Sequence, residues 1–257
     1  MKKFPMDYNN PWVMSNCLSL LNLVTTIVVN LKKMSLSLWT SVWPLLLSVT
    51  MTVSSTVMWL RDCGRESLCE NNNNKSYNSK MAILLFLLTE AFFFLSFFWM
   101  FTSTVLTPNF SFWPPMNLTL PSFIGAPSLN TILLVASSAT VTLSVHEKHL
   151  IHSFSFIWLI ITLFFSLLFL IVQYLEYTTL TFNFTSGVGG SIFFMATGFH
   201  GTHVILGTLI LLGCAYLMLT HFYTSHSIIS FELAAWYWHF VDAVWLMLYT
   251  TFYCWGH

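Results

Sequence analysis

The clearest structural signal in this chain is its last apolar run, which reads Glu232-Leu-Ala-Ala-Trp-Tyr-Trp-His-Phe-Val-Asp-Ala-Val-Trp-Leu-Met-Leu-Tyr-Thr-Thr-Phe-Tyr-Cys-Trp255. About 20 mostly apolar residues in a helix are enough to cross the hydrocarbon layer of a bilayer, so this run has membrane-spanning length. His239 and Asp242 lie near its middle. Polar groups at that depth are costly unless they find partners. The run therefore predicts membrane insertion together with a polar interaction inside the membrane.

The composition extends this interpretation to the whole chain. Of its 257 residues, 56% are hydrophobic, 18% are aromatic and only 7% are charged, whereas soluble domains carry about 25% charged residues. A soluble core cannot use that much apolar surface, so we predict a polytopic membrane protein. The formal net charge is +0, which leaves no basic field for nucleic acid, and we expect no nucleic-acid partner.

Seven apolar runs each exceed the ~17 residues that a membrane helix needs. They cover residues 12–30, 38–60, 81–106, 128–146, 151–176, 190–218 and 233–255. The predicted fold class is therefore all-α, with seven transmembrane helices in a single membrane domain over residues 1–257. The intervening segments are expected to be loops, because Arg61–Lys80 is polar, 107–127 is rich in proline and Thr178–Gly189 ends in glycine.

Basic residues predict the orientation of the chain. If the N-terminus faces the side of synthesis, that side collects most of the lysines and arginines, as the positive-inside rule requires. This side would hold Lys2, Lys3, Arg61, Arg65, Lys75, Lys80 and Lys148, and the opposite side only Lys32 and Lys33. We therefore expect the N-terminus on the cytoplasmic or matrix side and the C-terminus on the opposite side.

Glu90 is a buried carboxyl candidate, because it lies roughly 14 Å along a helix from Met81. Its neighbours on the same helix face are leucine and phenylalanine side chains, which cannot pair with a carboxylate. Two interpretations stay open: desolvation holds Glu90 neutral, or it meets a partner on another helix or a lipid head group. A structural role and a proton-handling role are both open.

Histidines and acidic residues recur in the last two apolar runs. His200 and His203 share a helix face, and Gly198, Gly201 and Gly207 beside them suggest close helix contact. We favour packing over metal binding for this pair, since a helical metal site needs a further ligand of defined placement. His239 and Asp242 are likewise three residues apart, and an imidazole–carboxylate pair is the simplest interpretation.

The remaining polar residues of the apolar runs and of one turn are expected to serve packing or the membrane interface. Glu176, together with Gln173, closes the fifth run, and Glu232 opens the seventh, where the helix dipole favours an acidic residue. A short turn that carries three histidines is expected to be solvated; it contains His146, His149 and His152.

Charged residues directly follow Trp59 on the predicted basic side, namely Arg61, Asp62, Arg65 and Glu66. Arginine at that depth pairs readily with lipid phosphate. An ordinary stop-transfer flank explains the same residues equally well, and both interpretations stay open.

With these residues in view, the chain resembles subunit III of mitochondrial cytochrome c oxidase. The resemblance is densest in the last third and continues upstream to Trp59. The motifs that carry it are Gly190-Ser-Ile-Phe-Phe-Met-Ala-Thr-Gly-Phe-His-Gly-Thr-His-Val204, Phe231-Glu-Leu-Ala-Ala-Trp-Tyr-Trp-His-Phe-Val-Asp-Ala-Val-Trp245, Trp59-Leu-Arg-Asp-Cys-Gly-Arg-Glu-Ser67, Thr89-Glu-Ala-Phe-Phe-Phe-Leu-Ser-Phe-Phe-Trp99, Trp113-Pro-Pro115, Leu129-Asn-Thr131 and Gln173-Tyr-Leu-Glu-Tyr177.

The resemblance implies a fold of two helix groups, 12–60 and 81–257, around a V-shaped cleft that holds phospholipids. These would be cardiolipin, phosphatidylethanolamine or phosphatidylglycerol. The resemblance places Glu90 at the buried, carbodiimide-reactive carboxylate position of the family. The residues that match the segment lining the lipid cleft are Trp59, Arg61, Arg65 and Glu66.

The resemblance also implies a place in the respiratory chain. The chain would be a subunit without a redox centre in the proton-pumping oxidase of the mitochondrial inner membrane, with haem a and copper in partner subunits. Subunit I would be its main contact, beside subunit II and accessory subunits. In the family this subunit supports assembly, stability and sustained proton uptake by subunit I. Whether a respiratory supercomplex partner docks on the chain stays open.

Two segments depart from the family pattern. The turn Val145-His-Glu-Lys-His149 is short, and the stretch 216–221 lacks the basic residues that commonly meet lipid phosphate there. Only His221 and His226 remain on that side as candidates for lipid binding.

Two other functions compete with this reading. A stand-alone seven-helix receptor or transporter is disfavoured, because Leu60-Arg61-Asp62 is not the receptor motif and no pair of broken half-helices is visible. An enzyme with its own metal at His200 and His203 would require metal bound to the isolated chain.

Overall fold

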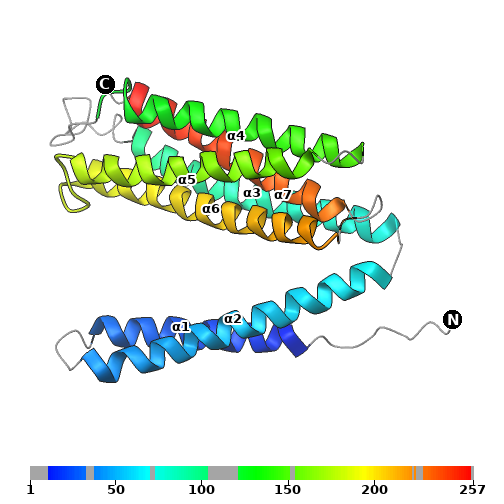
Figure 1. Cartoon of the computed structure of the whole chain (residues 1–257). Helices are drawn as coiled ribbons and strands as arrows, with labels where there is room; N and C mark the ends of the chain where they lie inside the picture. The colour runs from blue at the N-terminus through cyan, green and yellow to red at the C-terminus, as the bar shows by residue number, and fades with distance from the viewer. Residues whose placement is uncertain are drawn as a thin grey trace. The chain divides into compact units, whose positions relative to one another are not determined.

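The computed structural model of the chain describes residues 11–32, 38–69, 73–103, 121–150, 154–221, 223 and 228–255 (Figure 1). The chain divides into two compact units, Met1–Asn71 and Asn72–His257. Helices α1 and α2 belong to unit 1, and the remaining helices belong to unit 2.

Each predicted apolar run overlaps one α-helix of the structure, which confirms the all-α fold class. The helices are α1 (Pro11–Lys32), α2 (Leu38–Cys69), α3 (Asn73–Ser103), α4 (Ala126–His149), α5 (Ser155–Thr179), α6 (Val188–Leu219) and α7 (Ile229–Leu248), and α7 continues into the π-helix η2 (Tyr249–Cys254).

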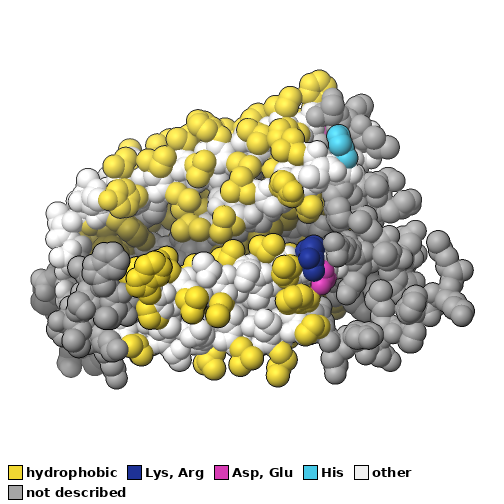
Figure 2. Space-filling view, turned by 60° about the horizontal axis from the view of Figure 1, so that its bottom comes forward, with side chains coloured by type: hydrophobic (Ala, Val, Ile, Leu, Met, Phe, Trp, Pro, Cys, Tyr) yellow, Lys and Arg dark blue, Asp and Glu magenta, His cyan; other side chains and the backbone are white. Residues whose placement is uncertain are grey.

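Six of these helices, α1 to α6, are long and apolar enough to cross a membrane. Hydrophobic side chains cover much of the face shown in Figure 2, with few charged groups among its described residues. Helix α7 is not among the six, because Glu232, His239 and Asp242 lower its mean hydropathy along with its tryptophans and tyrosines. The seventh span therefore stays a prediction.

The expectation of a loop over Arg61–Lys80 was wrong. Helix α2 continues to Cys69 and α3 already begins at Asn73. Polar residues in this stretch mark the end of the apolar layer, not the end of the helix, since the segment contains no proline to break it. By contrast, the predicted loop between α5 and α6 is present, and the proline-rich 107–127 lies largely outside the described residues.

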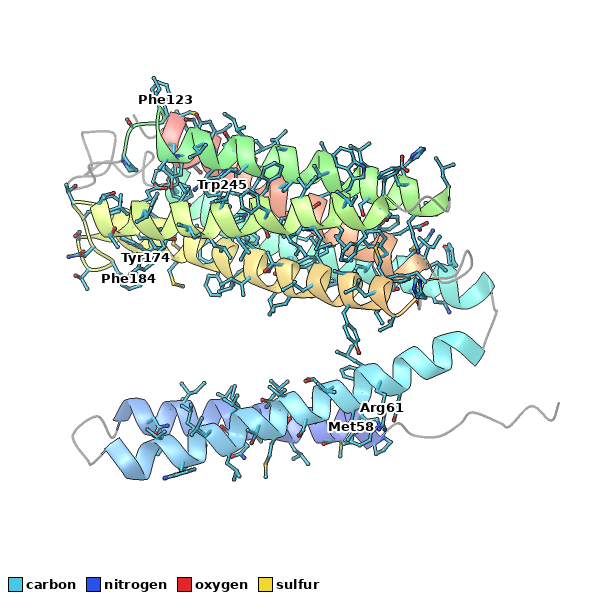
Figure 3. All side chains as sticks on the ribbon, in the orientation of Figure 1. Met58, Arg61, Phe123, Tyr174, Phe184 and Trp245 are labelled. Carbon is cyan, nitrogen blue, oxygen red and sulfur yellow. The ribbon has the colours of Figure 1, made fainter. Side chains whose placement is uncertain are left out.

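Aromatic side chains form the core of unit 2. Trp245, which is labelled in Figure 3, and Phe193 are fully buried. The ring of Trp245 contacts that of Phe169 edge-on at a centroid distance of 4.9 Å. The ring of Phe252 on η2 is tilted by 49° against that of Phe101 on α3, at a centroid distance of 4.4 Å. Aromatic pairs of this kind add to the free energy of packing beyond their buried area. The core therefore ties α3, α5, α6, α7 and η2 together.

Only one of the three glycines near the α6 histidines makes the close contact that we expected. A Cβ atom on Gly207 would lie 2.8 Å from Cε3 of Trp238, whereas one on Gly198 or Gly201 would meet nothing within 4 Å. The expectation was wrong for these two positions. At Gly207, one turn beyond the histidines, helix α6 therefore packs against α7 with no room for a side chain.

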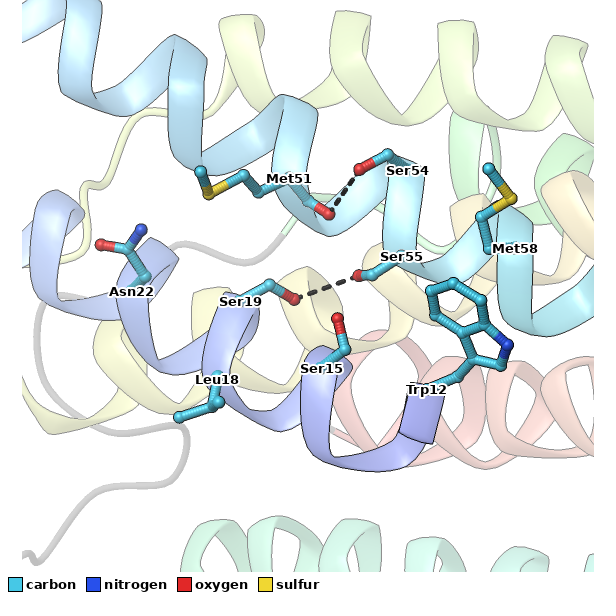
Figure 4. A pocket seen from close by; sticks show the side chains of 9 residues that line it. All are labelled: Trp12, Ser15, Leu18, Ser19, Asn22, Met51, Ser54, Ser55 and Met58. Carbon is cyan, nitrogen blue, oxygen red and sulfur yellow. Dashed lines mark hydrogen bonds between the residues drawn. The ribbon is translucent and has the colours of Figure 1, made fainter. Parts of the chain in front are cut away.

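Unit 1 is a pair of helices that bury small polar side chains against each other. Its buried residues among those described are Asn16 and Ser19 on α1 and Ser48 and Ser55 on α2. Ser55 donates a hydrogen bond of 2.8 Å to Oδ1 of Asn16, and its hydroxyl lies 3.2 Å from that of Ser19 (Figure 4). Lipid is as apolar as leucine, so small residues and interhelical hydrogen bonds carry helix association in a membrane.

We expect Ser55→Ala to weaken the association of α1 with α2 by about 0.6–1.7 kcal/mol, the range for interhelical hydrogen bonds in membranes. Ser54→Ala is the matched control, because Ser54 bonds only the Met51 carbonyl of its own helix. Energy transfer between labelled α1 and α2 peptides in detergent micelles measures the difference. Equal affinities for the two variants would contradict the polar interface.

Candidate functional site

Glu90 of α3 meets His203 of α6 inside unit 2. Oε2 of Glu90 lies 3.2 Å from Nε2 of His203, and the two side chains are 25% and 12% exposed. The ring of Phe94 packs edge-on against the imidazole at a centroid distance of 5.3 Å, and the ring of Tyr237 lies nearly parallel to it at 6.4 Å. Of the two interpretations of Glu90, the structure therefore supports a partner on another helix.

The hydrogen bonds of His203 restrict where its hydrogens lie. Nδ1 is 2.7 Å from the backbone oxygen of Phe199, which can only accept, so Nδ1 carries a hydrogen. A neutral imidazole then accepts at Nε2 from a protonated Glu90, and an imidazolium donates there to a carboxylate. In both cases one hydrogen lies between Nε2 and Oε2. The pair can thus hold a shared proton without a net charge in the membrane.

His200 faces away from this pair into the aromatic core. It is 1% exposed, and its Nε2 lies 3.2 Å from the backbone oxygen of Val241 on α7. The rings of Phe169 and Trp245 surround it. Both histidines contact α7, but the ring nitrogen Nε2 of His203 lies next to Glu90 on α3, whereas that of His200 lies next to Val241 on α7. In the described part of the chain, no three side chains of His, Cys, Asp and Glu gather closely enough to hold a metal ion.

His239 and Asp242 do not form the pair that we expected. Nδ1 of His239 lies 2.7 Å from the hydroxyl of Ser138 on α4, and Oδ1 of the buried Asp242 has no hydrogen-bond partner among the described residues. Next to them, Trp238 donates from Nε1 to Ser137 at 3.0 Å. Serines of α4 thus take the place of the expected carboxylate. Two serines in an apolar helix carry no signal that predicts these partners.

Glu176 lies in a second buried polar cluster, near the end of α5. Its Oε1 accepts a hydrogen bond of 2.8 Å from the hydroxyl of Tyr253 in η2. One turn earlier, Gln173 accepts a bond of 3.1 Å from Asn130 of α4. The sequence analysis placed Glu176 and Gln173 together at the end of the fifth run but did not identify Asn130 and Tyr253 as their partners. Asn130 lies in the motif Leu129-Asn-Thr131 and Tyr253 in the last apolar run. Only the packing of the helices brings them close to Gln173 and Glu176.

Glu232 connects three helices at one end of unit 2. Its carboxylate oxygens lie 3.1 Å from Nζ of Lys80 on α3 and 3.0 Å from Nε2 of His149 on α4. All three side chains are partly exposed, so each contact stabilises the fold by only about 0–1 kcal/mol. His149 was expected in a solvated turn but belongs to the last turn of α4 and binds Glu232. His146 is exposed, and His152 lies outside the described residues.

The predicted lipid-binding residues are described in part. Trp59 and Arg61 are exposed on α2, and Nε of Arg61 bonds Asp62 at 2.9 Å. Asp62 also accepts a bond from the indole of Trp12 on α1. His221 is exposed directly after α6, with a positive φ of 54°. The side chains of Arg65 and Glu66, and all of His226, lie outside the described residues.

A groove of about 500 Å³ lies between α1 and α2 in unit 1 (Figure 4). It mixes apolar and small polar side chains, and it reaches along α2 to Met58, one turn before Arg61. Its lining consists of Trp12, Ser15, Leu18, Ser19, Asn22, Met51, Ser54, Ser55 and Met58.

The long apolar helices and the inward pairing of their polar groups define a multi-pass helical membrane protein. Within this class, residues 2–257 match the family model of cytochrome c oxidase subunit III. The chain therefore belongs to the cytochrome c oxidase subunit III family and is a subunit of the cytochrome c oxidase complex.

Similar proteins match most of the chain or nearly all of it. Cytochrome c oxidase subunit 3 of Drosophila yakuba is 36% identical over 257 residues, which are 98% of this chain and 95% of that protein. The subunit 3 of Tachyglossus aculeatus aculeatus is 39% identical over 223 residues, 82% of this chain and 84% of that protein. That of Pylaiella littoralis is 42% identical over 210 residues, 77% and 75% of the two chains.

Proposed function

We propose that the chain supports sustained proton uptake by subunit I of the oxidase through the pair of Glu90 and His203. One observation carries this proposal: Nε2 of His203 lies 3.2 Å from Oε2 of Glu90 inside a membrane span, and both side chains remain partly exposed. While the pair holds its proton, it places no net charge in lipid. Passing the proton on leaves one negative charge on Glu90, which the next proton taken up neutralises. Haem a and copper lie in the partner subunits, and this chain acts on proton uptake and not on electron transfer.

The chain is placed by this proposal in the mitochondrial inner membrane, with its N-terminus in the matrix and its C-terminus in the intermembrane space. The contacts of Glu232 with Lys80 and His149 support the alternation of the helices, since they bring the start of α3, the end of α4 and the start of α7 to one end. Lys148 lies at the same end, as a basic matrix side requires. Subunit I is the main contact, with subunit II and accessory subunits beside it.

We expect Glu90→Gln to leave assembly and the initial rate of oxygen consumption close to the wild type. The amide can donate to Nε2 of His203, so the contact survives, but it cannot release a proton. Activity over many turnovers should therefore decline sooner. Oxygen consumption and proton pumping of the whole oxidase in vesicles, followed through repeated turnovers, measure both properties.

Glu147→Gln is the control for this experiment, because Glu147 lies at the end of α4 and makes no ion pair with a described residue. Sustained activity equal to that of the wild type in Glu90→Gln would refute the proton role. Failure of this variant to assemble would instead show that the pair needs an ionised carboxylate.

The same chain is proposed to bind phospholipid at the end of α2. Arg61 uses Nε for Asp62, and the terminal N–H groups of its half-exposed guanidinium have no acceptor among the described residues. Such groups suit the phosphate of cardiolipin, phosphatidylethanolamine or phosphatidylglycerol. The groove that ends at Met58 can take an acyl chain next to Trp59. His221 and His226 are the weaker candidates, together with Arg65 and Glu66.

Arg61→Ala should therefore reduce the phospholipid that stays with the purified oxidase. Native mass spectrometry of the intact complex with its lipids retained measures the loss. Lys148→Ala is the matched control, since it removes a basic residue on the same predicted side but from α4. Unchanged lipid content in Arg61→Ala would leave only the stop-transfer interpretation.

A further inference from the structure

The cluster around Glu176 contains more hydrogen-bonding capacity than its side chains use. Asn130 and Tyr253 are fully buried, and Gln173 and Glu176 are 6% and 4% exposed. Two bonds join the four side chains, from Asn130 to Gln173 and from Tyr253 to Glu176. Gln173 and Glu176 are three residues apart on α5, so both bonds lie on one face of that helix.

Three buried polar atoms of this cluster have no hydrogen-bond partner in the part of the chain that the structure describes. They are Oδ1 of Asn130, Nε2 of Gln173 and Oε2 of Glu176. Native proteins leave very few such atoms unpaired, because an unsatisfied polar group in a low dielectric is costly. Three of them on neighbouring side chains indicate a common partner that is not a side chain of this cluster.

The chemistry of these atoms does not depend on how the two amides are oriented. As assigned, Asn130 leaves an acceptor and Gln173 leaves a donor. Exchanging oxygen and nitrogen in both amides would keep the bond between them and again leave one donor and one acceptor. With the carboxyl oxygen of Glu176, the cluster always presents one N–H group and two oxygens.

We infer that this cluster binds an internal water molecule between α4, α5 and η2. A water can accept from the unused amide N–H and donate to the amide oxygen and to the Glu176 carboxylate, which uses each unpaired atom once. If Glu176 is protonated, the water accepts from its hydroxyl instead and the site still works. A metal cation fits poorly, since the amide N–H group would point at it.

The π-helix supplies the fourth side of this water site. Helix α7 changes to π geometry at Tyr249, and Trp255 donates to the carbonyl of Thr250, five residues earlier. Tyr253 lies within this wider turn and holds the other oxygen of Glu176. Turns of this kind often occur at functional sites in helices. The water and Tyr253 together would give each carboxyl oxygen of Glu176 a hydrogen-bond partner, at a site where the described residues provide no positively charged side chain.

A high-resolution cryo-electron microscopy map of the whole oxidase tests this inference directly. We expect a water peak within hydrogen-bond distance of Oε2 of Glu176 and of at least one of the two amides. The absence of a peak there would overturn the inference. So would a direct side-chain contact that pairs the three atoms, or a peak with the short distances of a coordinated cation.

Asn130→Leu provides the second arm of the test, because it removes one amide of the site. The map of this variant should lose the peak, whereas Thr142→Val should keep it. Thr142 is an exposed residue of the same helix that bonds only the carbonyl of Ala139. A peak that persists in Asn130→Leu would also contradict the proposed site. If the variant does not assemble, the wild-type map alone decides.

Discussion

Replacing Gly207 with valine should prevent the stable packing of α6 on α7 in unit 2. A Cβ atom at this position would lie 2.8 and 2.9 Å from two ring carbons of Trp238 and 3.3 Å from a ring carbon of Tyr237. Trp238 cannot move aside, since it is fully buried and donates to Ser137 on α4. The two additional methyl groups of valine worsen the overlap. We expect little of this variant in the purified oxidase.

A smaller change at the same position gives a graded result. Gly207→Ala should destabilise the subunit by about 1–3 kcal/mol, the usual cost of overpacking a core. Gly213→Ala is the matched control on the same helix, where an added Cβ meets nothing within 4 Å. That control should be neutral or stabilising by up to about 1 kcal/mol, because alanine favours the helix.

The temperature at which the subunit leaves the complex measures both alanine variants, and immunoblotting of the purified oxidase measures the valine variant. Similar behaviour of Gly207→Ala and Gly213→Ala would show that Trp238 can be displaced at little cost. Normal recovery of Gly207→Val would contradict the close contact of the two helices altogether.

The helices could be predicted from the sequence because each one contains an apolar run of about membrane-spanning length. This signal is local, and it does not depend on which helices pack against each other. It fails where a helix leaves the apolar layer, which is why the helical residues of α2 and α3 between Arg61 and Lys80 were expected to be a loop. Hydrophobicity reports the membrane boundary, whereas helix ends depend on backbone capping and proline.

The polar residues of the site could be predicted from the sequence, but their hydrogen-bond partners could not. Glu90 and His203 both stood out as polar groups in apolar runs, yet 113 positions separate them, and only the packing of α3 on α6 brings them together. Spacing along one helix suggested instead that His239 would pair with Asp242. The i, i+3 rule places two residues on one face but does not say whether a neighbouring helix offers a better partner. Ser138 of α4 is that partner for His239.

Removal of His203 is expected to have the larger effect at the proton-sharing pair. His203→Leu leaves the Glu90 carboxyl in the membrane span without its imidazole partner, and a carboxylate there costs about 2.5–3.5 kcal/mol. Glu90→Leu leaves Nε2 of His203 unpaired, at about 1–3 kcal/mol. Both single variants should therefore be recovered poorly in the complex. Thr202→Leu serves as the control, because Thr202 is exposed beside His203 and bonds only its own helix.

The double variant separates pairing from a general sensitivity of this region. Glu90→Leu with His203→Leu removes both polar groups, and replacing both partners by apolar side chains is often nearly neutral for stability. We expect the double variant to assemble better than either single variant, with a coupling energy of about 1–3 kcal/mol. The thermal release of the subunit from the oxidase gives all four values of the cycle. If the losses of the single variants simply add in the double variant, Glu90 and His203 act independently, and the proton cannot be a shared one.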